Sequence, residues 1–281
     1  MLVNTKVLLE KAMKLKYAVP HFNINNLEWA KYILEEAQAN NSPVILGVSE
    51  GASKYMGGYI TISNMIKGLI IDLNITVPVA LHLDHGSTVS ACFKAIDAGF
   101  TSIMIDGSKF DLATNIKMVN EVINYTKGQT IEAEVGHIGG TEDDLTNNIA
   151  YAKTEDCLTL VKNTNIDSLA PALGSVHGIY KGLPQLDFKR MKEIKQKTKL
   201  PLVLHGGTGI PDDLIKKAIN NGICKININT ELQIVWSNEI KKFISNNDKI
   251  YDPRKIISSG QQEIKKVVKA KIILFGSQNK A

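Results

Sequence analysis

The chain alternates between short apolar runs rich in β-branched residues and longer segments in which apolar positions recur with helical spacing. Short apolar runs bounded by turn signals are typical of buried strands, whereas the longer pattern is typical of amphipathic helices. The strand-like runs lie at residues 18–24, 43–49, 78–85, 102–108, 130–138, 168–174, 200–208 and 224–230. Helical patterns occupy residues 27–40, 89–99, 112–128, 188–198 and 212–222, and several of them end in glycine, a helix-stop signal.

Regular alternation of strand and helix predicts parallel strands joined by right-handed crossovers. Eight such units favour a (β/α)8 TIM barrel, which typically takes about 250 residues, so we expect one α/β domain over residues 1–281. A doubly wound sheet is the alternative, but no GxGxxG follows the first run. The segment from Asp252 onward predicts one long C-terminal helix. Pro171 predicts a bulge or a late start in the sixth strand, because proline lacks the N–H that a central strand needs.

Polar residues that could bind a ligand or take part in catalysis stand where the apolar runs end. In a TIM barrel the carboxyl ends of the strands meet at one face, and that face holds the active site. We therefore expect the polar strand ends to surround a single site. They are Asn23, Ser49, Asp84, His85, Asp106, Glu134, His177, His205, Asn227, Asn229 and Thr230.

Three of the six histidines, His85, His177 and His205, lie at or just after strand ends. Three neutral imidazoles that converge and leave one position open describe a catalytic zinc site. The alternative is three unrelated polar strand ends, and the choice between them depends on the barrel prediction.

Two further polar residues, His82 and Glu132, each stand two positions before a polar strand end and share its face, one layer deeper. A buried histidine and a buried glutamate in that layer are expected to orient the metal ligands rather than to bind the metal. His21 and His137 are interpreted as structural or loop residues.

Glycine-rich segments after the later strands predict an anion site. Gly206, Gly207 and Thr208 precede a helix, and Asn229 and Thr230 precede another. Free N–H groups and the helix dipole at such positions favour phosphate.

Two more glycine-rich segments flank this region. The segment GSVHGIYKG places Lys181 and two glycines around a histidine, an arrangement that also suits an anion. Residues 136–148 are glycine-rich and acidic, which is typical of a mobile loop that closes over a site, although an exposed acidic loop has the same composition.

Composition narrows the class of protein further. The net charge of +5 is spread along the chain without a polybasic block, which suits anionic small molecules and gives little support to nucleic-acid binding. No apolar run approaches the ~20 residues of a membrane span, and charges interrupt the N-terminal segment, unlike a signal peptide. The three cysteines form no CxxC, so reduced thiols and a cytoplasmic location are expected.

Taken together, the motifs resemble the class II, metal-dependent fructose-bisphosphate aldolases, and the compact length is similar to their shorter bacterial branch. The motifs are PHFNINN, SPVILGVSEGASKYMGG, LHLDHG, EAEVGHIGGTEDD, APALGSVHGIYKG, LHGGTGIP, KININTE and YDPRK, which together cover nearly the whole chain. The resemblance implies reversible cleavage of fructose 1,6-bisphosphate to dihydroxyacetone phosphate and glyceraldehyde 3-phosphate through a zinc-stabilised enediolate. It also implies Zn²⁺ as cofactor, a monovalent cation (Na⁺ or K⁺) near the phosphate, and a homodimer or homotetramer.

Site residues follow from the resemblance position by position. The zinc ligands are implied to be His85, His177 and His205, with Asp106 and Glu134 as alternative metal positions. The resemblance implies that Asp84 transfers a proton at the C4 hydroxyl and that Glu142 transfers a proton on dihydroxyacetone phosphate. It implies that Asn227 holds the enediolate. The ketose-phosphate cradle is implied to consist of Gly178, Gly206, Thr208, Asn229 and Thr230. The acceptor half is implied to meet Asn23 and Ser49, with Arg254 at the far phosphate, supplied by the same or a neighbouring subunit.

Several alternatives remain to be weighed. A Schiff-base aldolase would need a lysine at a strand end, but Lys225 begins its strand at the wrong end and no other lysine lies within a strand. Tagatose 1,6-bisphosphate is the closest rival substrate. A metal-dependent hydrolase would usually carry His-x-His on the first strand, where this chain has PHFN. A non-catalytic sugar-phosphate-binding barrel would have little need of Asp84 and Glu142.

Overall fold

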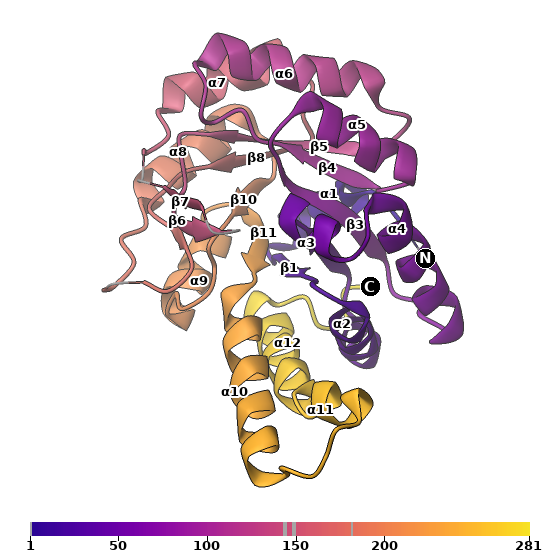
Figure 1. Cartoon of the computed structure of the whole chain (residues 1–281). Coiled ribbons are helices and arrows are strands. Elements are labelled where there is room, and N and C mark those ends of the chain that lie inside the picture. Colours follow the sequence, from indigo (N-terminus) through magenta and orange to yellow (C-terminus); the bar gives the residue numbers. More distant parts are fainter. Residues whose placement is uncertain (1, 143–144, 148–149, 181) are drawn as a thin grey trace.

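Parallel strands close into a barrel, which confirms the fold predicted from the alternating pattern (Figure 1). The computed structural model describes residues 2–142, 145–147, 150–180 and 182–281, without the side chains of 141–142 and 145–147. Within these residues the barrel strands run in the order β1-β11-β10-β8-β5-β4-β3-β2. Their bounds are β1 (Val19–Asn23), β2 (Val44–Val48), β3 (Val79–Gly86), β4 (Ser102–Ile105), β5 (Thr130–Val135), β8 (Ser168–Pro171), β10 (Leu202–Leu204) and β11 (Ile223–Ile228).

The helices surround the barrel, and several of them begin at a capping side chain. Asn26, Ser49, Thr88 and Asp111 each accept a hydrogen bond from a backbone N–H in the first turn that follows, which satisfies a donor that the helix leaves free. The bounds are α1 (Thr5–Leu15), α2 (Leu27–Ala39), α3 (Glu50–Tyr55), α4 (Tyr59–Asp72), α5 (Val89–Ala98), α6 (Leu112–Tyr125), α7 (Thr154–Asn163), α8 (Phe188–Thr198), α9 (Asp212–Asn220) and α10 (Thr230–Asn246).

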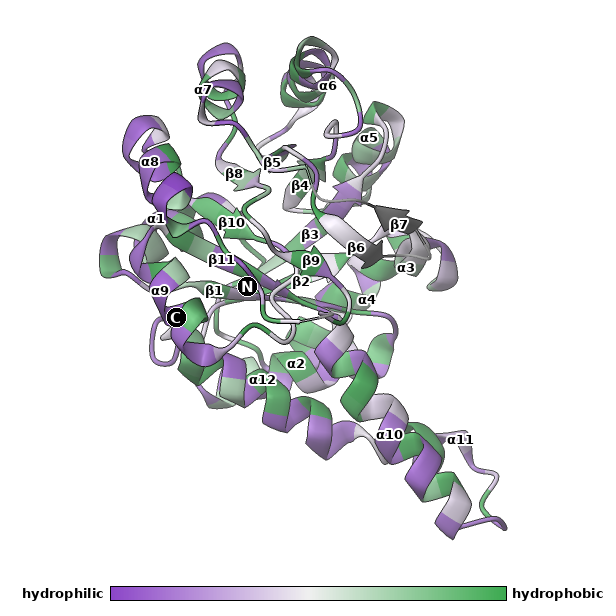
Figure 2. Cartoon of the chain, turned by 90° about the vertical axis from the view of Figure 1, so that its left-hand side faces the viewer, coloured by the Kyte–Doolittle hydropathy of each residue, from purple (hydrophilic) through white to green (hydrophobic). Residues whose placement is uncertain are grey.

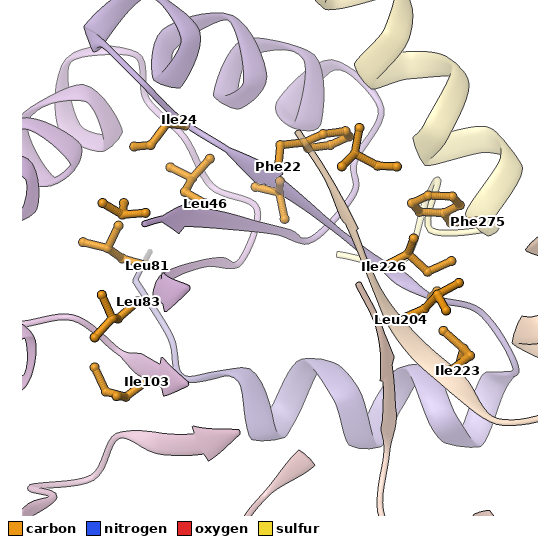
Figure 3. Close-up of a cluster of buried hydrophobic side chains, with 14 of the residues drawn as sticks. Phe22, Ile24, Leu46, Leu81, Leu83, Ile103, Leu204, Ile223, Ile226 and Phe275 are labelled. Atoms are coloured by element: carbon orange, nitrogen blue, oxygen red, sulfur yellow. The ribbon is translucent and has the colours of Figure 1, made fainter. Parts of the chain in front are cut away.

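The main apolar core lies between the strands and the surrounding helices. Alternate strand residues such as Leu81 and Leu83 point outward into this layer and are fully buried (Figure 3). The outer turns of helices such as α8 are mostly hydrophilic (Figure 2). A second apolar cluster joins α1 to the amino ends of the strands and includes Leu9 and Ile45, so α1 closes the bottom of the barrel.

The predicted long C-terminal helix is present, but it begins later than Asp252, and a short helix precedes it. The two helices are α11 (Pro253–Ser258) and α12 (Gln261–Phe275). Between them lies Gly260, where an added Cβ would stand 2.3 Å from Cδ1 of Trp236 on α10. Close approach of the indole explains the glycine at this turn. The long final helix α12 packs against α2 and α10, while α10 and α11 project from the barrel as an arm (Figures 1 and 2).

The sixth barrel strand is shorter than predicted, and Pro171 is its last residue rather than the site of a bulge or a late start. Pro171 is in register with Val135, and the next residue, Ala172, donates its N–H to the Val135 carbonyl at 2.9 Å. The missing proline N–H is tolerated because the strand ends there.

A small sheet over the barrel mouth was not anticipated. It contains β6 (Gly139–Glu142), β7 (Leu145–Asn147) and β9 (Val176–His177), in the order β7-β6-β9. Gly140 has φ +97°, and a Cβ there would lie 2.0 Å from the His177 carbonyl oxygen, so glycine allows the two backbones to pack closely. The glycine-rich segment predicted to be a mobile loop therefore includes strands that support His177, while its mobility stays a prediction.

The described part of the chain contains no helix that is both long and apolar enough to span a membrane.

Candidate metal and substrate site

The three predicted ligand histidines converge at the carboxyl ends of the barrel strands. Ring centroids are 5.0 Å apart for His85 and His177, 4.6 Å for His85 and His205, and 5.9 Å for His177 and His205. One ring nitrogen from each lies within 4.8 Å of the others. Nε2 of His85 is 2.9 Å from Nδ1 of His205, although 120 residues separate them along the chain.

The backbone at the end of β3 is unusual, because His85 has φ +50°, in the left-handed region that side chains rarely adopt. The next residue, Gly86, leaves room for Met104, since an added Cβ would lie 2.7 Å from the Met104 carbonyl oxygen. Strain of this kind persists where the surrounding structure holds it in place, and it clusters at functional sites. Here it accompanies the residue that approaches both other histidines.

Two carboxylates complete a second possible ligand group around the same imidazole. Oδ2 of Asp106 is 3.0 Å from Nδ1 of His85, and Oε2 of Glu134 is 3.9 Å from that nitrogen. Burial raises the pKa of Glu134 well above its ordinary value, and the nearby Asp106 carboxylate adds to the effect. Burial would also raise the pKa of Asp106, but its hydrogen bond to His85 holds it below the usual range.

The residues present fit a divalent cation. Burial lowers the pKa of His177 and of His205 below the ordinary value, which keeps both imidazoles neutral and able to donate a lone pair. Oε2 of Glu134 is buried and has no hydrogen-bond partner among the described residues. Neutral imidazoles beside buried carboxylate oxygens are the donors that zinc and related metals take in proteins.

Below the histidines, a buried ion pair supports the site. Oε1 of Glu132 is 3.0 Å from Nε2 of His205, and Nζ of Lys225 is 2.9 and 2.8 Å from the two Glu132 oxygens. Burial would raise the pKa of Glu132, but Lys225 holds it well below the ordinary value, so it is ionised. This geometry matches the orienting position expected for Glu132. Because Lys225 is fully buried and ion-paired, it also has no free amine for a Schiff base.

His82 forms hydrogen bonds with Lys225 and Ser102, so its link to the histidine cluster is less direct than predicted. Its Nε2 is 3.2 Å from Nζ of Lys225, and its Nδ1 is 2.8 Å from Oγ of Ser102. These contacts link His82 to His205, a predicted ligand, through Lys225 and Glu132. Lys225 therefore holds a central place in the network, which the sequence interpretation missed because it considered only strand ends.

The carboxylate of Asp84 lies beside the histidines and is held by two amides. Nδ2 of Asn23 donates to Oδ2 at 2.8 Å, and Nδ2 of Asn227 donates to Oδ1 at 3.2 Å. Nε2 of His21 is 3.7 Å from Oδ2, so His21, interpreted as structural, is a neighbour of this group. Burial would raise the pKa of Asp84, but the imidazoles of His21 and His85 hold it well below its ordinary value. Asp84 is thus ionised and fixed in orientation.

The predicted phosphate segments also come together. Oγ1 of Thr208 accepts the Glu231 N–H at 3.3 Å, which joins the loop after β10 to the start of α10, the helix that begins at Thr230. Gly207 donates its N–H to the Asn227 carbonyl at 3.0 Å. Oδ1 of Asn229 is buried and, in the described part of the chain, has no hydrogen-bond partner.

Tyr180 ties a further part of this region together, although the sequence interpretation gave it no role. Its hydroxyl donates to the Gly206 carbonyl at 2.9 Å and accepts the Val176 N–H at 3.1 Å. Gly206 and Gly178 have φ +65° and +86°, and a Cβ on Gly206 would lie 2.2 Å from the Val176 carbonyl oxygen. The glycines after β9 and β10 therefore permit a close backbone approach next to His177.

Two predicted site residues have side chains outside the described part of the chain, and a third lies on the arm. Lys181 lies outside the described residues, and so does the side chain of Glu142, whose backbone ends β6. Arg254 is on α11, which belongs to the arm that projects from the barrel (Figure 1). Its side chain is 89% exposed and paired with Asp252 at 2.9 Å. Within this chain, Arg254 belongs to the arm.

A cavity of about 390 Å³ opens beside the histidines. Its lining includes Ser49 and Asp84, which were predicted, and also Lys109 and His137, to which the sequence interpretation assigned no function. Lys109 follows the polar end of β4 by three residues, and that proximity was the available signal. His137 was interpreted as a structural or loop residue, and its place in the lining could not be read from local pattern.

A (β/α)8 barrel whose strand ends bring together three histidines, two carboxylates and a separate ionised aspartate defines a metal-dependent barrel enzyme. The family model described as "Fructose-bisphosphate aldolase class-II" matches residues 3–280. The chain belongs to the class II fructose-bisphosphate aldolase family and is therefore a lyase.

Individual relatives agree with this assignment. A protein from Geobacillus stearothermophilus and one from Staphylococcus aureus, both named fructose-bisphosphate aldolase, are each 53% identical over 283 residues, which cover 100% of this chain and 99% of theirs. The crystal structure of the YdjI aldolase from Escherichia coli K12 has a TM-score of 0.85 at 32% identity and covers 100% of both chains. The fructose-bisphosphate aldolase from Campylobacter jejuni, at 23% identity, shares the fold with a TM-score of 0.82 over 100% of this chain and 97% of its own.

Proposed function

We propose that residues 1–281 form one aldolase domain that reversibly cleaves fructose 1,6-bisphosphate to dihydroxyacetone phosphate and glyceraldehyde 3-phosphate. The observation that carries the proposal is the placement of the ionised Asp84 carboxylate beside the histidine cluster at the barrel mouth. Cleavage of the C3–C4 bond needs a base for the C4 hydroxyl proton and an electron sink next to the carbonyl. The site offers groups for both, and the relatives carry the same activity in their names.

His85, His177 and His205 would hold the metal, which we propose to be zinc, with Asp106 and Glu134 as an alternative ligand group around His85. When bound, zinc supplies Lewis-acid stabilisation of negative charge on the ketose oxygens. Glu132 orients His205 through its 3.0 Å contact with Nε2, so that Nδ1 faces the metal side.

The proton-transfer steps are assigned to two carboxylates. Asp84 accepts the C4 hydroxyl proton, since Asn23 and Asn227 fix both of its oxygens and its lowered pKa keeps it ionised. Glu142 is proposed to return a proton to the dihydroxyacetone phosphate half. Asn227 is proposed to donate to the substrate as well as to Asp84.

The two phosphates are assigned to opposite sides of the histidines. The segments containing Gly178, Gly206 to Thr208, and Asn229 with Thr230 would bind the ketose phosphate, together with Lys181 and a Na⁺ or K⁺ ion. Ser49 would contact the acceptor half. Arg254 would reach the far phosphate of a neighbouring subunit in a homodimer or homotetramer, because the α10–α11 arm carries it away from the barrel of its own chain. A cytoplasmic location completes the proposal.

The test compares Asp84→Ala with the unmodified enzyme, measuring cleavage of fructose 1,6-bisphosphate and bound zinc on the same samples. We expect a large loss of kcat, of about a hundredfold or more because a positioned base is removed, with zinc content retained. Asp213→Ala is the matched control, since Asp213 is exposed on α9 and should leave turnover unchanged. Normal turnover in Asp84→Ala would refute the assignment.

Parallel assays separate the alternative reactions. Comparison of fructose and tagatose 1,6-bisphosphates as substrates distinguishes the two stereochemical preferences. Release of inorganic phosphate without triose phosphates would instead indicate a hydrolase.

A further inference from the structure

The lining of the cavity beside the histidines includes no residue of the proposed phosphate-binding segments 206–208 and 229–230. It comes from the carboxyl ends of β2 to β5 and the loops that follow them, together with His177 on β9. A substrate whose ketose phosphate lies over β10 and β11 would place its other half in this cavity. That half ends in a second phosphate. Among the contacts proposed above, those from the same chain include Ser49 but no cationic side chain.

Lys109 lies in this cavity on a well-anchored turn. The Ser108 N–H donates to Oδ1 of Asp106 at 3.0 Å, and the Phe110 N–H donates to the Gly107 carbonyl at 3.0 Å. Gly107 itself packs tightly, because an added Cβ would lie 2.4 Å from Oδ1 of Asn115. The turn therefore keeps a fixed relation to the metal-side carboxylate of Asp106, while the Lys109 side chain is exposed and has no ion-pair partner among the described residues.

His137 stands next to this turn. Its Nδ1 is 2.9 Å from Oγ of Ser108, the residue before Lys109, so one ring nitrogen is engaged there. Its backbone is held by reciprocal hydrogen bonds with Ala150, at 2.7 and 2.8 Å. His137 also lines the cavity, so we infer that its other ring nitrogen, Nε2, supplies a second polar contact on the same side as the lysine.

The balance of charge makes a cation important in this half of the site. The carboxylates of Glu50, Asp84 and Asp106 line the cavity and would repel a phosphate. The Ser87 N–H, just after β3, donates to Oε1 of Glu50 at 2.6 Å and so fixes the Glu50 carboxylate beside the end of that strand. Of the lysines and arginines in the described residues, Lys109 is the one that lines the cavity.

We propose that Lys109, with His137 beside it, binds the phosphate of the acceptor half within the same subunit and so selects phosphorylated aldehydes. The proposal rests on the aldolase activity proposed above. It differs from the role of Arg254, which would act from a neighbouring chain.

The test measures condensation by zinc-loaded Lys109→Met with dihydroxyacetone phosphate and either glyceraldehyde 3-phosphate or unphosphorylated glyceraldehyde. We expect the KM for glyceraldehyde 3-phosphate to rise about tenfold or more, as for loss of a charged hydrogen bond. The KM for dihydroxyacetone phosphate and the rate with glyceraldehyde should stay unchanged. Lys109→Arg should retain most of the affinity, and Lys94→Met, which removes an exposed lysine of α5, is the matched control.

An unchanged KM for glyceraldehyde 3-phosphate in Lys109→Met would overturn the proposal. An equal loss with both aldehydes, or a loss of bound zinc, would also overturn it, because either result indicates a general structural effect. Failure of the proposed function is distinguishable, since the unmodified enzyme would then make no fructose 1,6-bisphosphate.

Discussion

The buried pair of Lys225 and Glu132 allows a quantitative test of how the barrel interior supports the site. Both side chains are at most 2% exposed, and Nζ of Lys225 contacts both carboxylate oxygens. Lys225→Met removes the cation and leaves an uncompensated buried carboxylate below His205. Glu132→Gln does the converse and leaves a buried ammonium with one neutral acceptor in place of two charged ones.

The expected magnitude follows from this burial. Removing one partner of a buried ion pair costs about 3–5 kcal/mol, because the remaining charge stays desolvated. The double variant Lys225→Met with Glu132→Gln leaves neither charge, but it weakens the bond to His205, which should cost about 1–3 kcal/mol. The double variant should therefore lose several kcal/mol less than the sum of the single variants.

The assay is urea unfolding of all four proteins in EDTA, so that metal binding does not add to the stability of the folded state. Zinc affinity, measured by competition with a chelator, should fall about 10- to 100-fold in Glu132→Gln, because Glu132 orients a ligand. Additive losses of stability across the four proteins would refute the claim that the two charges compensate each other. Undiminished zinc affinity in Glu132→Gln would refute the orienting role.

Three further predictions test other parts of the structure. Complete chelation with EDTA should abolish cleavage and added zinc should restore it; full activity of the chelated enzyme would contradict the metal assignment. Burial lowers the pKa of His82 to about 3, so the unfolded chain, but not the folded one, binds a proton below about pH 6.5. The free energy of unfolding of the metal-free protein should therefore fall as pH drops from 6.5 toward 3, with His82 contributing about 1.4 kcal/mol per pH unit. His82→Gln should remove this contribution. An identical pH dependence of stability in both proteins would contradict the assignment to His82. Gly47→Ala should destabilise the protein by about 1–3 kcal/mol in thermal unfolding, since the new Cβ would meet Nε2 of His21 at 1.6 Å. The control Gly68→Ala, in α4, has open space around the new Cβ and should stabilise the protein by roughly 0.5–1 kcal/mol. Equal melting temperatures for the two variants would contradict this reasoning.

The barrel and the centre of its site were predictable because their signals are local. Apolar periodicity over a few residues distinguishes strand from helix, and the eight strand segments agree with the structure to within a few residues at each end. The position of Asp84 and His85 at the barrel mouth could be predicted because parallel strands of a barrel all end at one face. Closure of the barrel then brings His205 to His85 across 120 residues of chain.

Other features depend on contacts between distant segments that no local pattern encodes. Lys225 appeared in the sequence as a residue at the wrong end of its strand, yet strand register places its ammonium against Glu132, 93 residues away. The break at Gly260 reflects the position of Trp236 on another helix, and the sheet that supports His177 forms from residues in two different loops. Periodicity along the chain specifies which helices and strands form, because every turn of a helix and every pair of strand residues repeats the same pattern of apolar and polar positions. The contacts between side chains of different strands depend on strand register and on closure of the sheet, which exist only once the whole barrel is assembled.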